Sequence, residues 1–468
     1  MIDTSEPKSV FRLHHATSVR DASGRVLMMP SSVSSARQLP GIDQEQARVA
    51  GHDTDSGQRC VPELRFIRDD TTEHGLRQVF QAVQALSPFC VIPDGSDSVR
   101  LDENVDDEVT PALAGVTAAS PVSTKNEELY LQCLSSGTSG EARRIQRSQQ
   151  SWISSFEVNA RMLQATADDS YAIVGRLSHS LPLYASLEAC HIGADLHLIG
   201  DLRPDRQLSA LKELQTSVLY LTPAQARLLC RARPAFGQQQ VPGLRHVLCG
   251  GGKLDEMTRH ALSELFNNAA IVEFYGASET SFITMSNQQT PEGSVGCAYP
   301  GVKLKILDEE GEMTTAEGEI WVSSPYLFSG YSQGGWRDTR WRDGYLSIGE
   351  CGQLDEAGFL FLRGRKARQA NVADTRVYLE EIEAVLLQHA TVEHCVVVTR
   401  QDALRGEVLL AVVEGSFDEQ WRRQLLSFAR ERLGATLAPR EILFLDSLPY
   451  LDAGKPDIVR IQTLVTSL

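Results

Sequence analysis

The chain has 468 residues, of which 42% are hydrophobic, and its formal net charge is −16. This length predicts roughly three domain-sized units, and the acidic balance argues against a nucleic acid partner. No run approaches the ~18 apolar residues of a membrane-spanning helix, and the N-terminus lacks the basic and apolar regions of a secretory signal. The nine scattered cysteines include no C-x-x-C pair. They predict neither a disulfide framework nor a zinc site, and they favour a reducing cytoplasm.

Residues 1–60 carry no motif, and their Ser- and Gly-rich stretches are typical of loops. Apolar spacing then predicts a helix over residues 75–86 and a short buried strand at 89–92. Further strands are predicted at 129–134, 171–174, 196–199, 217–221, 245–249 and 270–275, and helices at 152–165, 185–192, 206–214, 223–230 and 257–266. This alternation indicates an α/β fold with a parallel sheet covered by helices, which binds ligands at the carboxyl ends of its strands.

From about Gly293 the pattern changes to short alternating strands with intervening turns, as at residues 302–307 and 318–322. Such a pattern indicates an antiparallel or barrel-like subdomain. Beyond Gly364 the chain predicts a small α+β unit with helices at 378–389 and 419–433 and strands at 392–399, 408–413 and 441–445. We therefore expect a large N-terminal unit, residues 1–363, and a small C-terminal unit, residues 364–468.

Residues 134–143 form a stretch rich in small side chains between the predicted strand 129–134 and the predicted helix 152–165, so we expect it to lead from a strand into a helix. Its glycines can adopt positive φ, and successive backbone N–H groups in such a loop form an anion-binding nest. The hydroxyl groups add donors and the arginine adds a fixed positive charge, which suits a polyphosphate. The spacing is not that of a P-loop NTPase, and a flexible surface loop is the structural alternative. The candidate phosphate-binding residues are Ser135, Ser136, Gly137, Thr138, Ser139, Gly140 and Arg143.

Residues 273–280 contain a second candidate site at the end of a predicted strand. Mg²⁺ commonly binds one or two carboxylates together with substrate phosphates. Glu279 is therefore a candidate Mg²⁺ ligand, Ser278 a candidate donor to a phosphate, and Tyr275 a candidate for stacking on adenine. An ordinary strand end with an exposed glutamate is the alternative.

Residues 135–143 resemble the phosphate-loop signature of the adenylate-forming superfamily, with Arg143 in place of the usual final lysine. This superfamily comprises acyl- and aryl-CoA synthetases, peptide-synthetase adenylation domains and luciferases. Residues 275–279 resemble its Y-G-x-T-E motif, with Ser278 for threonine. Residues 343–350 resemble D-G-W-x-x-T-G-D, with Glu350 in place of the aspartate that binds the ribose hydroxyls. In order, the motifs cover about residues 129–460.

Two further motifs fall in the C-terminal third of the chain. Residues 361–365 resemble the G-R sequence that begins the interdomain hinge, so the resemblance assigns Arg365 to the ribose or phosphate. Residues 448–457 resemble P-x-T-x-x-G-K, which makes Lys455 the catalytic lysine of a mobile C-terminal domain. A positive charge there would offset the repulsion between a carboxylate and the α-phosphate.

The resemblance also implies a pocket for the acid substrate. His179 stands where family members place an aromatic residue or a histidine that walls this pocket, although a core histidine is the structural alternative. The same region lacks the aspartate that binds an amino acid's ammonium group, which argues for an aryl or aliphatic acid. The pocket and its nucleotide side are expected to use His179, Ser180, Gly250, Gly251, Gly252, Tyr275, Gly276 and Ala277.

The hinge region departs most from the family pattern. Arg368 stands where an acidic residue or lysine usually forms the pivot, and Ala373 and Asp374 replace a glycine pair that opens the thioester tunnel. Adenylation is untouched by these changes, whereas transfer to a thiol is in question.

The resemblance implies an enzyme that uses ATP and Mg²⁺ to convert a small carboxylic acid to an acyl-adenylate. The acyl group would then pass to CoA or to the phosphopantetheine thiol of a separate acyl carrier protein. A non-catalytic nucleotide- or acyl-adenylate-binding protein on the same fold is the alternative.

Overall fold

The computed structural model describes most of the chain from β5 (Tyr130–Ser135) onward, together with short segments before it. The described residues are 19–20, 26–28, 65–69, 78–79, 82, 89–93, 130–135, 143–236, 241–334, 338–373, 375–402, 406–450 and 456–466. Residues 136–140 and Lys455, which the sequence assigns to the site, lie outside them, as do most of residues 1–60.

A nine-stranded sheet forms the centre of the N-terminal unit, in the order β13-β12-β11-β10-β9-β7-β8-β1-β2. Neighbouring strands from β11 to β1 are parallel, as the strand–helix alternation predicts. These strands are β1 (Val19–Arg20), β7 (Ser170–Ile173), β8 (Asp195–Leu198), β9 (Val218–Leu221), β10 (His246–Cys249) and β11 (Ala270–Ala277). The edges are antiparallel and comprise β2 (Val26–Met28), β12 (Ser281–Met285) and β13 (Cys297–Ala298).

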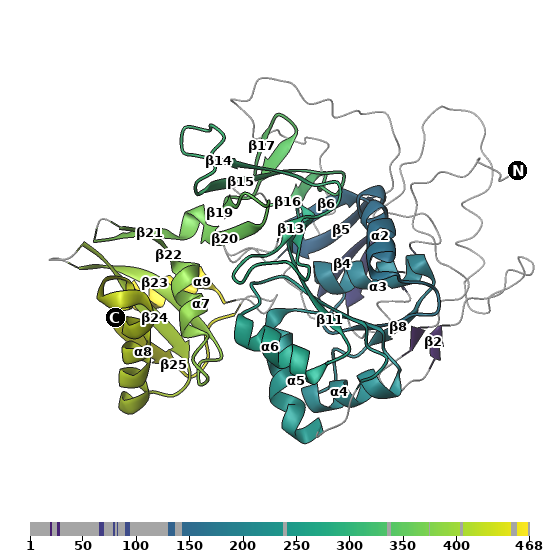
Figure 1. The fold of residues 1–468 in the computed structure, drawn as a ribbon, viewed down its shortest axis with the longest axis horizontal. Coiled ribbons are helices and arrows are strands. Elements are labelled where there is room, and N and C mark those ends of the chain that lie inside the picture. The colour runs from purple at the N-terminus through teal and green to yellow at the C-terminus, as the bar shows by residue number, and fades with distance from the viewer. Residues whose placement is uncertain are drawn as a thin grey trace, which may run out of the picture.

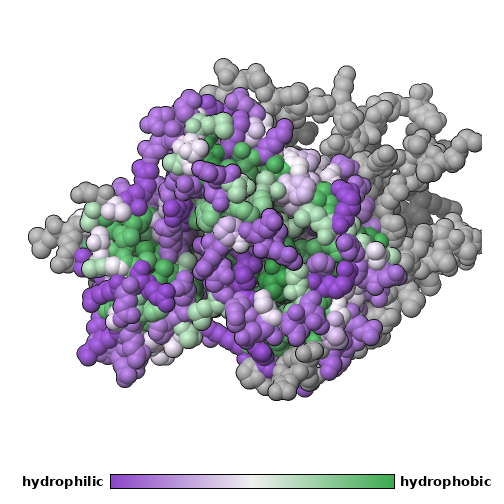
Figure 2. Space-filling model, in the orientation of Figure 1, coloured by the Kyte–Doolittle hydropathy of each residue, from purple (hydrophilic) through white to green (hydrophobic). Residues whose placement is uncertain are grey.

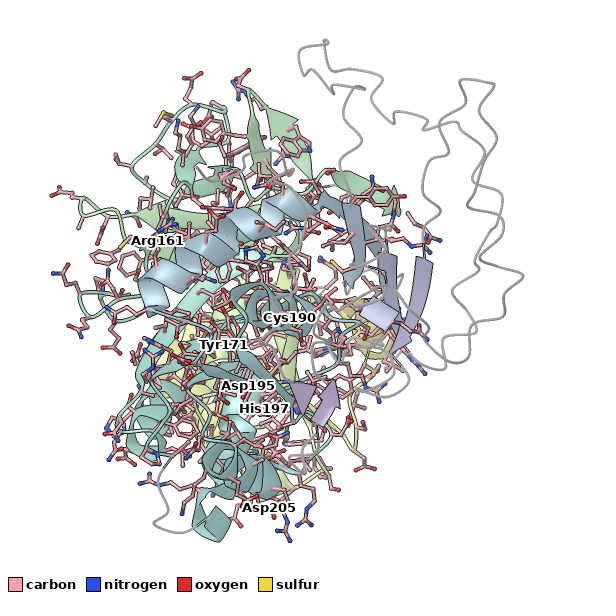
Figure 3. All side chains as sticks on the ribbon, turned by 90° about the vertical axis from the view of Figure 1, so that its right-hand side faces the viewer. Arg161, Tyr171, Cys190, Asp195, His197 and Asp205 are labelled. Carbon is pink, nitrogen blue, oxygen red and sulfur yellow. The ribbon has the colours of Figure 1, made fainter. Side chains whose placement is uncertain are left out.

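Helices cover both faces of this sheet (Figure 1). Alternate side chains of one strand enter different cores: Tyr171 and Ile173 join the core on one face, and Ala172 joins the core on the other. The first face carries α2 (Gln149–Leu163) and α3 (Ser180–Ile192), and Figure 3 shows α3, with Cys190, beside the strands of Tyr171 and His197. The second face carries α4 (Pro204–Glu213), α5 (Pro223–Phe236) and α6 (Glu256–Leu265).

A second sheet, in the order β16-β6-β5-β4-β3, corrects one expectation. The glycine-rich stretch does not lead from a strand into a helix. It joins β5 to β6 (Arg143–Ser148), which pair antiparallel, and α2 begins only after β6. The remaining strands are β3 (Arg65–Asp69), β4 (Phe89–Pro93), which confirms the strand predicted at 89–92, and β16 (Gly330–Gln333).

An antiparallel six-stranded sheet follows and confirms the change of pattern expected after Gly293. Its strands are β14 (Lys303–Leu307), β15 (Gly318–Ser323), β17 (Arg340–Arg342), β18 (Tyr345–Ser347), β19 (Glu350–Leu354) and β20 (Leu360–Arg365). A short 3-10 turn, Lys366–Arg368, leads from β20 to the C-terminal unit.

The C-terminal unit is α+β, as expected, with its own apolar cores on the two faces of a small sheet. In Figure 1 it lies beside the antiparallel sheet and the end of α5, and hydrophilic residues cover much of the same face in Figure 2. Its elements are β21 (Gln369–Val372), β22 (Thr375–Tyr378), α7 (Leu379–Leu386), β23 (Cys395–Asp402), β24 (Gly406–Glu414), α8 (Glu419–Leu437), β25 (Glu441–Leu445) and α9 (Ile458–Thr466).

Some predicted boundaries were wrong. α3 begins at Ser180 rather than at residue 185, because Pro182 lies in the first turn, where a missing N–H costs no hydrogen bond. α5 continues to Phe236, and β6 and α9 were not predicted. Among the described residues, no helix has the length and apolar character to cross a membrane.

Candidate active site

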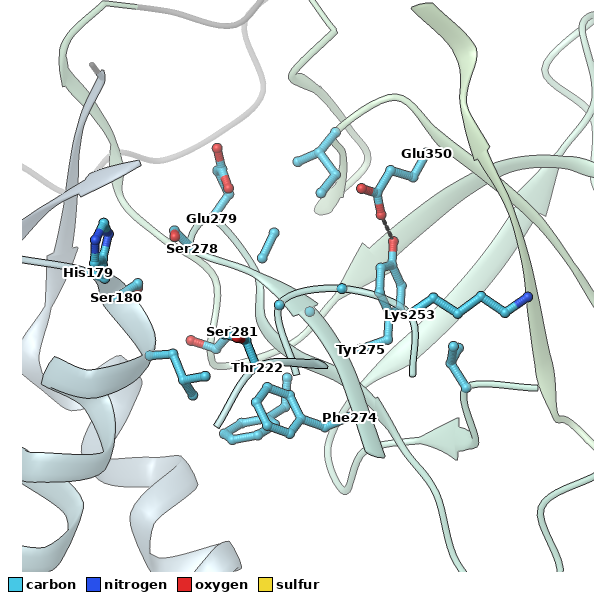
Figure 4. A pocket seen from close by; sticks show the side chains of 18 of the residues that line it. His179, Ser180, Thr222, Lys253, Phe274, Tyr275, Ser278, Glu279, Ser281 and Glu350 are labelled. Atoms are coloured by element: carbon cyan, nitrogen blue, oxygen red, sulfur yellow. Dashed lines mark hydrogen bonds between the residues drawn. The ribbon is translucent and has the colours of Figure 1, made fainter. Parts of the chain in front are cut away.

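A cavity of about 860 Å³ lies at the carboxyl ends of the central parallel strands. Residues that follow or end four of these strands line it: Val174 and Gly175 after β7, Thr222 after β9, Gly251 and Gly252 after β10, and residues 273–277 of β11. Side chains of β6, α3, β19 and β20 close its sides (Figure 4). The cavity thus lies at the edge where we expect an α/β sheet to bind its ligand.

The N-terminus of α3 faces this cavity with His179 and Ser180. A parallel backbone bridge joins His179 to Leu134 near the end of β5, so the root of the glycine-rich stretch lies against the start of α3. The Ser180 hydroxyl also lies 3.6 Å from the buried Cys133 thiol. The positive end of the α3 dipole is therefore directed at the region where an anionic group would bind.

Glu350 organises the side of the cavity formed by β11, β19 and β20. The Tyr275 hydroxyl donates a hydrogen bond to one carboxylate oxygen of Glu350, and Arg365 Nε donates to the other at 3.3 Å. Burial, reinforced by the negative charge of Glu350, raises the pKa of Tyr275 well above its usual value. Tyr275 thus remains a neutral donor, and Arg365 supplies the countercharge.

Glu279 lies at the opposite side of the same cavity, after β11, and only 9% of the residue is exposed. The Tyr331 hydroxyl donates to Glu279 Oε1 at 2.8 Å and lies 3.0 Å from Thr339 Oγ1. Burial lowers the pKa of Arg143, but the nearby Tyr331 and Glu279 oppose this shift. An acidic side chain and a basic one thus meet at the wall next to the end of β5.

The glycines at this wall have different roles. Gly251, with a φ of +85°, and Gly252 line the cavity, and a Cβ on either would meet nothing closer than 3.7 Å. Gly250 does not line it: a Cβ there would lie 2.2 Å from the Phe274 ring, so Gly250 admits that ring against the backbone. At Gly276, a Cβ would lie 2.0 Å from the Ser281 carbonyl oxygen, which makes the close β11–β12 approach possible only with glycine.

The structure therefore brings most of the sequence-predicted site residues to one cavity. Those that line it are Arg143, His179, Ser180, Gly251, Gly252, Tyr275, Gly276, Ala277, Ser278, Glu279, Glu350 and Arg365. Ser135 ends β5, opposite Arg143 in the β5–β6 pair. Gly250 packs behind the wall, and Ser136, Gly137, Thr138, Ser139, Gly140 and Lys455 lie outside the described residues.

Sequence reasoning missed Arg147, a charged residue with no exposed surface beneath this site. Its guanidinium donates to the Ser281 hydroxyl, to the Ser278 carbonyl oxygen at 3.0 Å and to the Tyr326 carbonyl oxygen at 3.3 Å. It also lies 5.0 Å from the centre of the Trp152 ring. Burial lowers its pKa to about 10, so it remains a cation at neutral pH. Arg147 thereby holds the turn that carries Glu279.

Further lining residues had no distinctive signal in the sequence. Lys253 follows the glycine turn, and Trp152, Tyr184, Phe274 and Phe282 are apolar or aromatic residues of the kind that any core contains. The C-terminal unit contributes Glu380, Glu381 and Ala384 of α7. The cavity therefore lies where the two units meet, a common place for ligand sites.

The donor set around Glu279 can be compared with the needs of Mg²⁺. In the described parts of the chain, no three His, Cys, Asp or Glu side chains gather as a metal site. A single carboxylate next to a phosphate-binding region fits a Mg²⁺ ion that takes its other oxygen ligands from a nucleotide and water. A metal held by protein side chains alone would not fit these residues.

Comparison with known proteins agrees with this geometry. The family model for AMP-binding enzymes matches residues 54–332, and the model for their C-terminal domain matches residues 381–455. An uncharacterized acyl–CoA ligase of Bacillus subtilis is 29% identical over 344 residues, which are 72% of this chain and 69% of that protein. A putative long-chain fatty acid–CoA ligase of Staphylococcus epidermidis is 27% identical over 322 residues, 68% of each chain.

Among solved structures, the amide bond synthetase of Marinactinospora thermotolerans superposes with a TM-score of 0.66 at 23% identity. The superposition covers 88% of this chain and 91% of the synthetase, so the fold is shared from the large N-terminal domain to the small C-terminal one. The first family model alone spans more than half of the chain, and it includes the glycine-rich stretch and residues 275–279. The chain belongs to the family of AMP-binding enzymes.

Proposed function

We propose that the protein is an ATP-dependent acid–thiol ligase, which activates a carboxylic acid as an acyl-adenylate and passes the acyl group to a thiol. One observation carries the proposal. A single cavity at the carboxyl ends of the parallel strands gathers Arg143, Glu279 and the Tyr275–Glu350–Arg365 cluster. These groups suit the phosphates, the Mg²⁺ and the ribose of one ATP molecule.

Two displacement steps complete this reaction. A carboxylate oxygen attacks the α-phosphorus of ATP, the bond to the β-phosphate oxygen breaks, and pyrophosphate leaves. The thiol sulfur then attacks the acyl carbon, its proton is lost to solvent, and AMP leaves with the electrons of the C–O bond. Glu279 would hold Mg²⁺, which neutralises phosphate charge when it is bound. The protein's contribution is alignment and charge: Arg143 beside the phosphates, the α3 N-terminus, and Lys455 between the carboxylate and the α-phosphate.

The lining residues of the α3 region support an acid that is not an amino acid. Arg176, His179, Ser180, Leu181, Pro182 and Tyr184 line this part of the cavity. None of these side chains is acidic, so an ammonium group would have no countercharge there. The thiol can belong to CoA or to the phosphopantetheine arm of an acyl carrier protein, and the names of the acyl–CoA ligase relatives favour CoA.

We further propose that residues 1–363 form the adenylation core and that residues 364–468 rotate between the two half-reactions. Residues 364 and 365 end β20, the 3-10 turn follows, and α7 contributes Glu380 and Glu381 to the cavity wall. Movement of α7 would therefore open and close one side of the site.

ATP–pyrophosphate exchange with a panel of aryl, short-chain and long-chain acids tests the proposal. We expect exchange with one class of acid and a loss of about 100-fold or more in Lys455→Ala, because the charge that offsets the anionic repulsion is removed. Lys303→Ala is the matched control, since Lys303 is exposed on β14 and does not line the cavity.

Two outcomes would contradict parts of this function. Binding of ATP without exchange for any acid would favour a non-catalytic binding protein. That alternative is motivated by the sequence departures from the family at Glu350, Arg368, Ala373 and Asp374. If the enzyme forms the adenylate and acylates a carrier protein but not CoA, the thiol acceptor is the carrier protein.

A further inference from the structure

The inner part of the cavity is built from the rings of Trp152 on α2, Tyr184 on α3, Phe274 on β11 and Phe282 on β12. The Tyr184 ring stands edge-on to Trp152 at 5.3 Å and to Phe282 at 5.2 Å, and Phe274 lies tilted against Phe282 at 4.7 Å. Each residue is at most 8% exposed. We call these four side chains the aromatic chamber. In Figure 4, Phe274 lies on the far side of the cavity from Glu279 and Glu350.

The polar atoms of the chamber are bonded to other protein groups. Trp152 Nε1 donates to the Ser281 hydroxyl at 3.2 Å. The Tyr184 hydroxyl lies 2.9 Å from Ser155 Oγ and accepts from Asn159 Nδ2 at 3.2 Å. Burial raises the pKa of Tyr184 well above its usual value, so this hydroxyl stays neutral. What the chamber presents to a ligand is therefore apolar ring surface. The Arg147 guanidinium, 5.0 Å from the centre of the Trp152 ring, does not line the cavity.

Buried side chains close the chamber from behind. Tyr299 stacks on Phe282 at 4.9 Å, and Tyr326 stands edge-on to Tyr299 at 5.4 Å. Tyr299 is 1% exposed and donates a 2.7 Å hydrogen bond to Asn159, whereas neither Tyr299 nor Tyr326 lines the cavity. The Phe274 ring rests on the Gly250 backbone. A long alkyl chain could pass this wall only by displacing packed and hydrogen-bonded rings.

We infer that the acid substrate is a compact aromatic carboxylic acid whose ring binds in the aromatic chamber. This inference rests on the proposed ligase function and specifies its substrate. A flat ring can make edge-to-face contacts with Trp152, Tyr184 and Phe282 that a flexible alkyl chain cannot make, and it loses little conformational entropy on binding. The carboxylate of such an acid then remains in the polar part of the same cavity.

Pairs of acids with equal carbon number test this inference by ATP–pyrophosphate exchange: phenylacetate against octanoate, and 4-phenylbutanoate against decanoate. Each pair holds the carbon number constant and compares a phenyl ring with a linear alkyl chain. We expect kcat/KM to be at least about tenfold higher for the aromatic member than for the linear member of at least one pair. For hexadecanoate, we expect kcat/KM to be lower than for either shorter linear acid. Higher kcat/KM for both linear members, or for hexadecanoate, would overturn the inference while leaving the ligase function intact.

A binding measurement decides the inference independently of turnover. Aromatic acid in the chamber is expected to change the emission of Trp152, and the change is expected to disappear in Trp152→Phe. Equilibrium dialysis shows independently whether the acid is bound. If the acid is bound at saturation and the emission of the parent protein does not change, the ring binds elsewhere and the inference is overturned. Binding that changes the Trp152 emission, without exchange for any acid, would remove the proposed function and leave the chamber as a binding site for aromatic acids.

Phe282→Leu tests the chamber wall. Loss of the ring opens space towards Tyr299, so we expect the ratio of kcat/KM for decanoate over 4-phenylbutanoate to rise about tenfold. Phe266→Leu is the matched control, because Phe266 is equally buried in the other core and does not line the cavity. An equal ratio in the parent and in folded Phe282→Leu would contradict the inference, and the Trp152 measurement decides it if this variant does not fold.

Discussion

Arg147 is a single buried charge that positions the turn carrying Glu279, the residue proposed to hold Mg²⁺. Its guanidinium donates to the Ser281 hydroxyl and to the backbone carbonyl oxygens of Ser278 and Tyr326. Ser278 and Ser281 lie on either side of Glu279 in the chain. A lysine retains the charge but cannot present the same planar fork of donors. The position of Glu279 therefore depends on the shape of the Arg147 side chain as well as on its charge.

For Arg147→Lys, we expect the Mg²⁺ concentration for half-maximal exchange to rise about tenfold, because Glu279 loses its fixed position. Carbonyl groups left without a donor should also lower the free energy of unfolding by about 1–3 kcal/mol. Exchange measured across a Mg²⁺ titration separates the two effects, since a purely structural loss would lower activity at every Mg²⁺ concentration equally. Arg245→Lys, at an ion pair with Asp169 outside the cavity lining, is the control.

Glu188 is a second buried charge-bearing residue, with no exposed surface, and it accepts a hydrogen bond from the Tyr220 hydroxyl. Burial raises its pKa from 4.5 to about 7, although the hydrogen bonds of Tyr220 and Asn159 oppose the shift. Its contribution to stability is therefore fully present below pH 4.5 and is lost as the pH rises through about 7.

Glu188→Gln should remove this pH dependence. Relative to the parent protein, the variant is expected to gain stability between about pH 5 and pH 7, by up to about 3 kcal/mol, because the neutral amide never ionises. Urea unfolding of both proteins at several pH values measures the difference. A difference that stays constant over this range would show that the Glu188 carboxyl does not titrate there.

Arg368 links the hinge to helix α7. It forms two hydrogen bonds with Glu383, at 3.0 and 2.7 Å, and donates to the Val397 carbonyl oxygen at 2.8 Å. Glu380 lies 3.7 Å away, and burial raises its pKa to about 7 despite this positive charge. The arginine at the pivot position is thus fixed to the C-terminal unit, so rotation would have to occur on its N-terminal side, between Arg365 and Arg368.

Arg368→Gln leaves two partly buried carboxylates without their cation. We expect the C-terminal unit to be destabilised by about 3 kcal/mol, and thioester formation to fall at least tenfold while pyrophosphate exchange changes less. Thermal unfolding and the two half-reactions, measured separately, check this. Arg400→Gln is the control, because it removes a more exposed pair with Glu441 within the C-terminal unit and Arg400 does not line the cavity. Equal losses in both half-reactions would argue against a role in the rotation.

The same elements illustrate what the sequence could and could not predict. The central strands β7 to β10 were predictable because they are almost wholly buried and therefore consist mainly of apolar residues. β6 was not, since its inward residues include Arg143 and Arg147, which give no apolar alternation. The motif residues of the site were predictable, but Arg147–Ser281 and Tyr275–Glu350 contacts join segments 134 and 75 residues apart. Such pairings depend on the tertiary fold.

At the scale of the whole molecule, polar contacts hold the C-terminal unit against the rest. Arg231 of α5 pairs with Glu393, the Tyr378 hydroxyl donates to Glu317 at 2.7 Å, and Arg363 lies 3.2 Å from Glu317 and 3.1 Å from Glu381. The arginine pairs are substantially exposed, so each contributes at most about 1 kcal/mol and is screened by salt. An interface of this kind can be broken and remade in each catalytic cycle.

Arg231→Gln is therefore expected to change the ratio of the adenylation rate to the thioester-forming rate by no more than about fivefold. Added salt should also affect this ratio less in the variant than in the parent protein, because the ion pair that salt screens is gone. The measurement is the rate of each half-reaction from low to physiological ionic strength. Arg203→Gln, which removes an exposed pair with Asp205 in the N-terminal unit, should leave the ratio unchanged. An equal effect in both variants would mean that the Arg231–Glu393 pair does not influence the rotation.

The pairing of β1 with β8 has a consequence for shortened forms of the chain. β1 continues the central sheet beyond β8 at Val19–Leu196 and Arg20–His197. A form that lacks residues 1–28 would leave backbone N–H and C=O groups of β8 uncovered at the sheet margin, on a strand that does not itself line the cavity. Its first defect would be self-association through this edge, with the affinity for ATP intact.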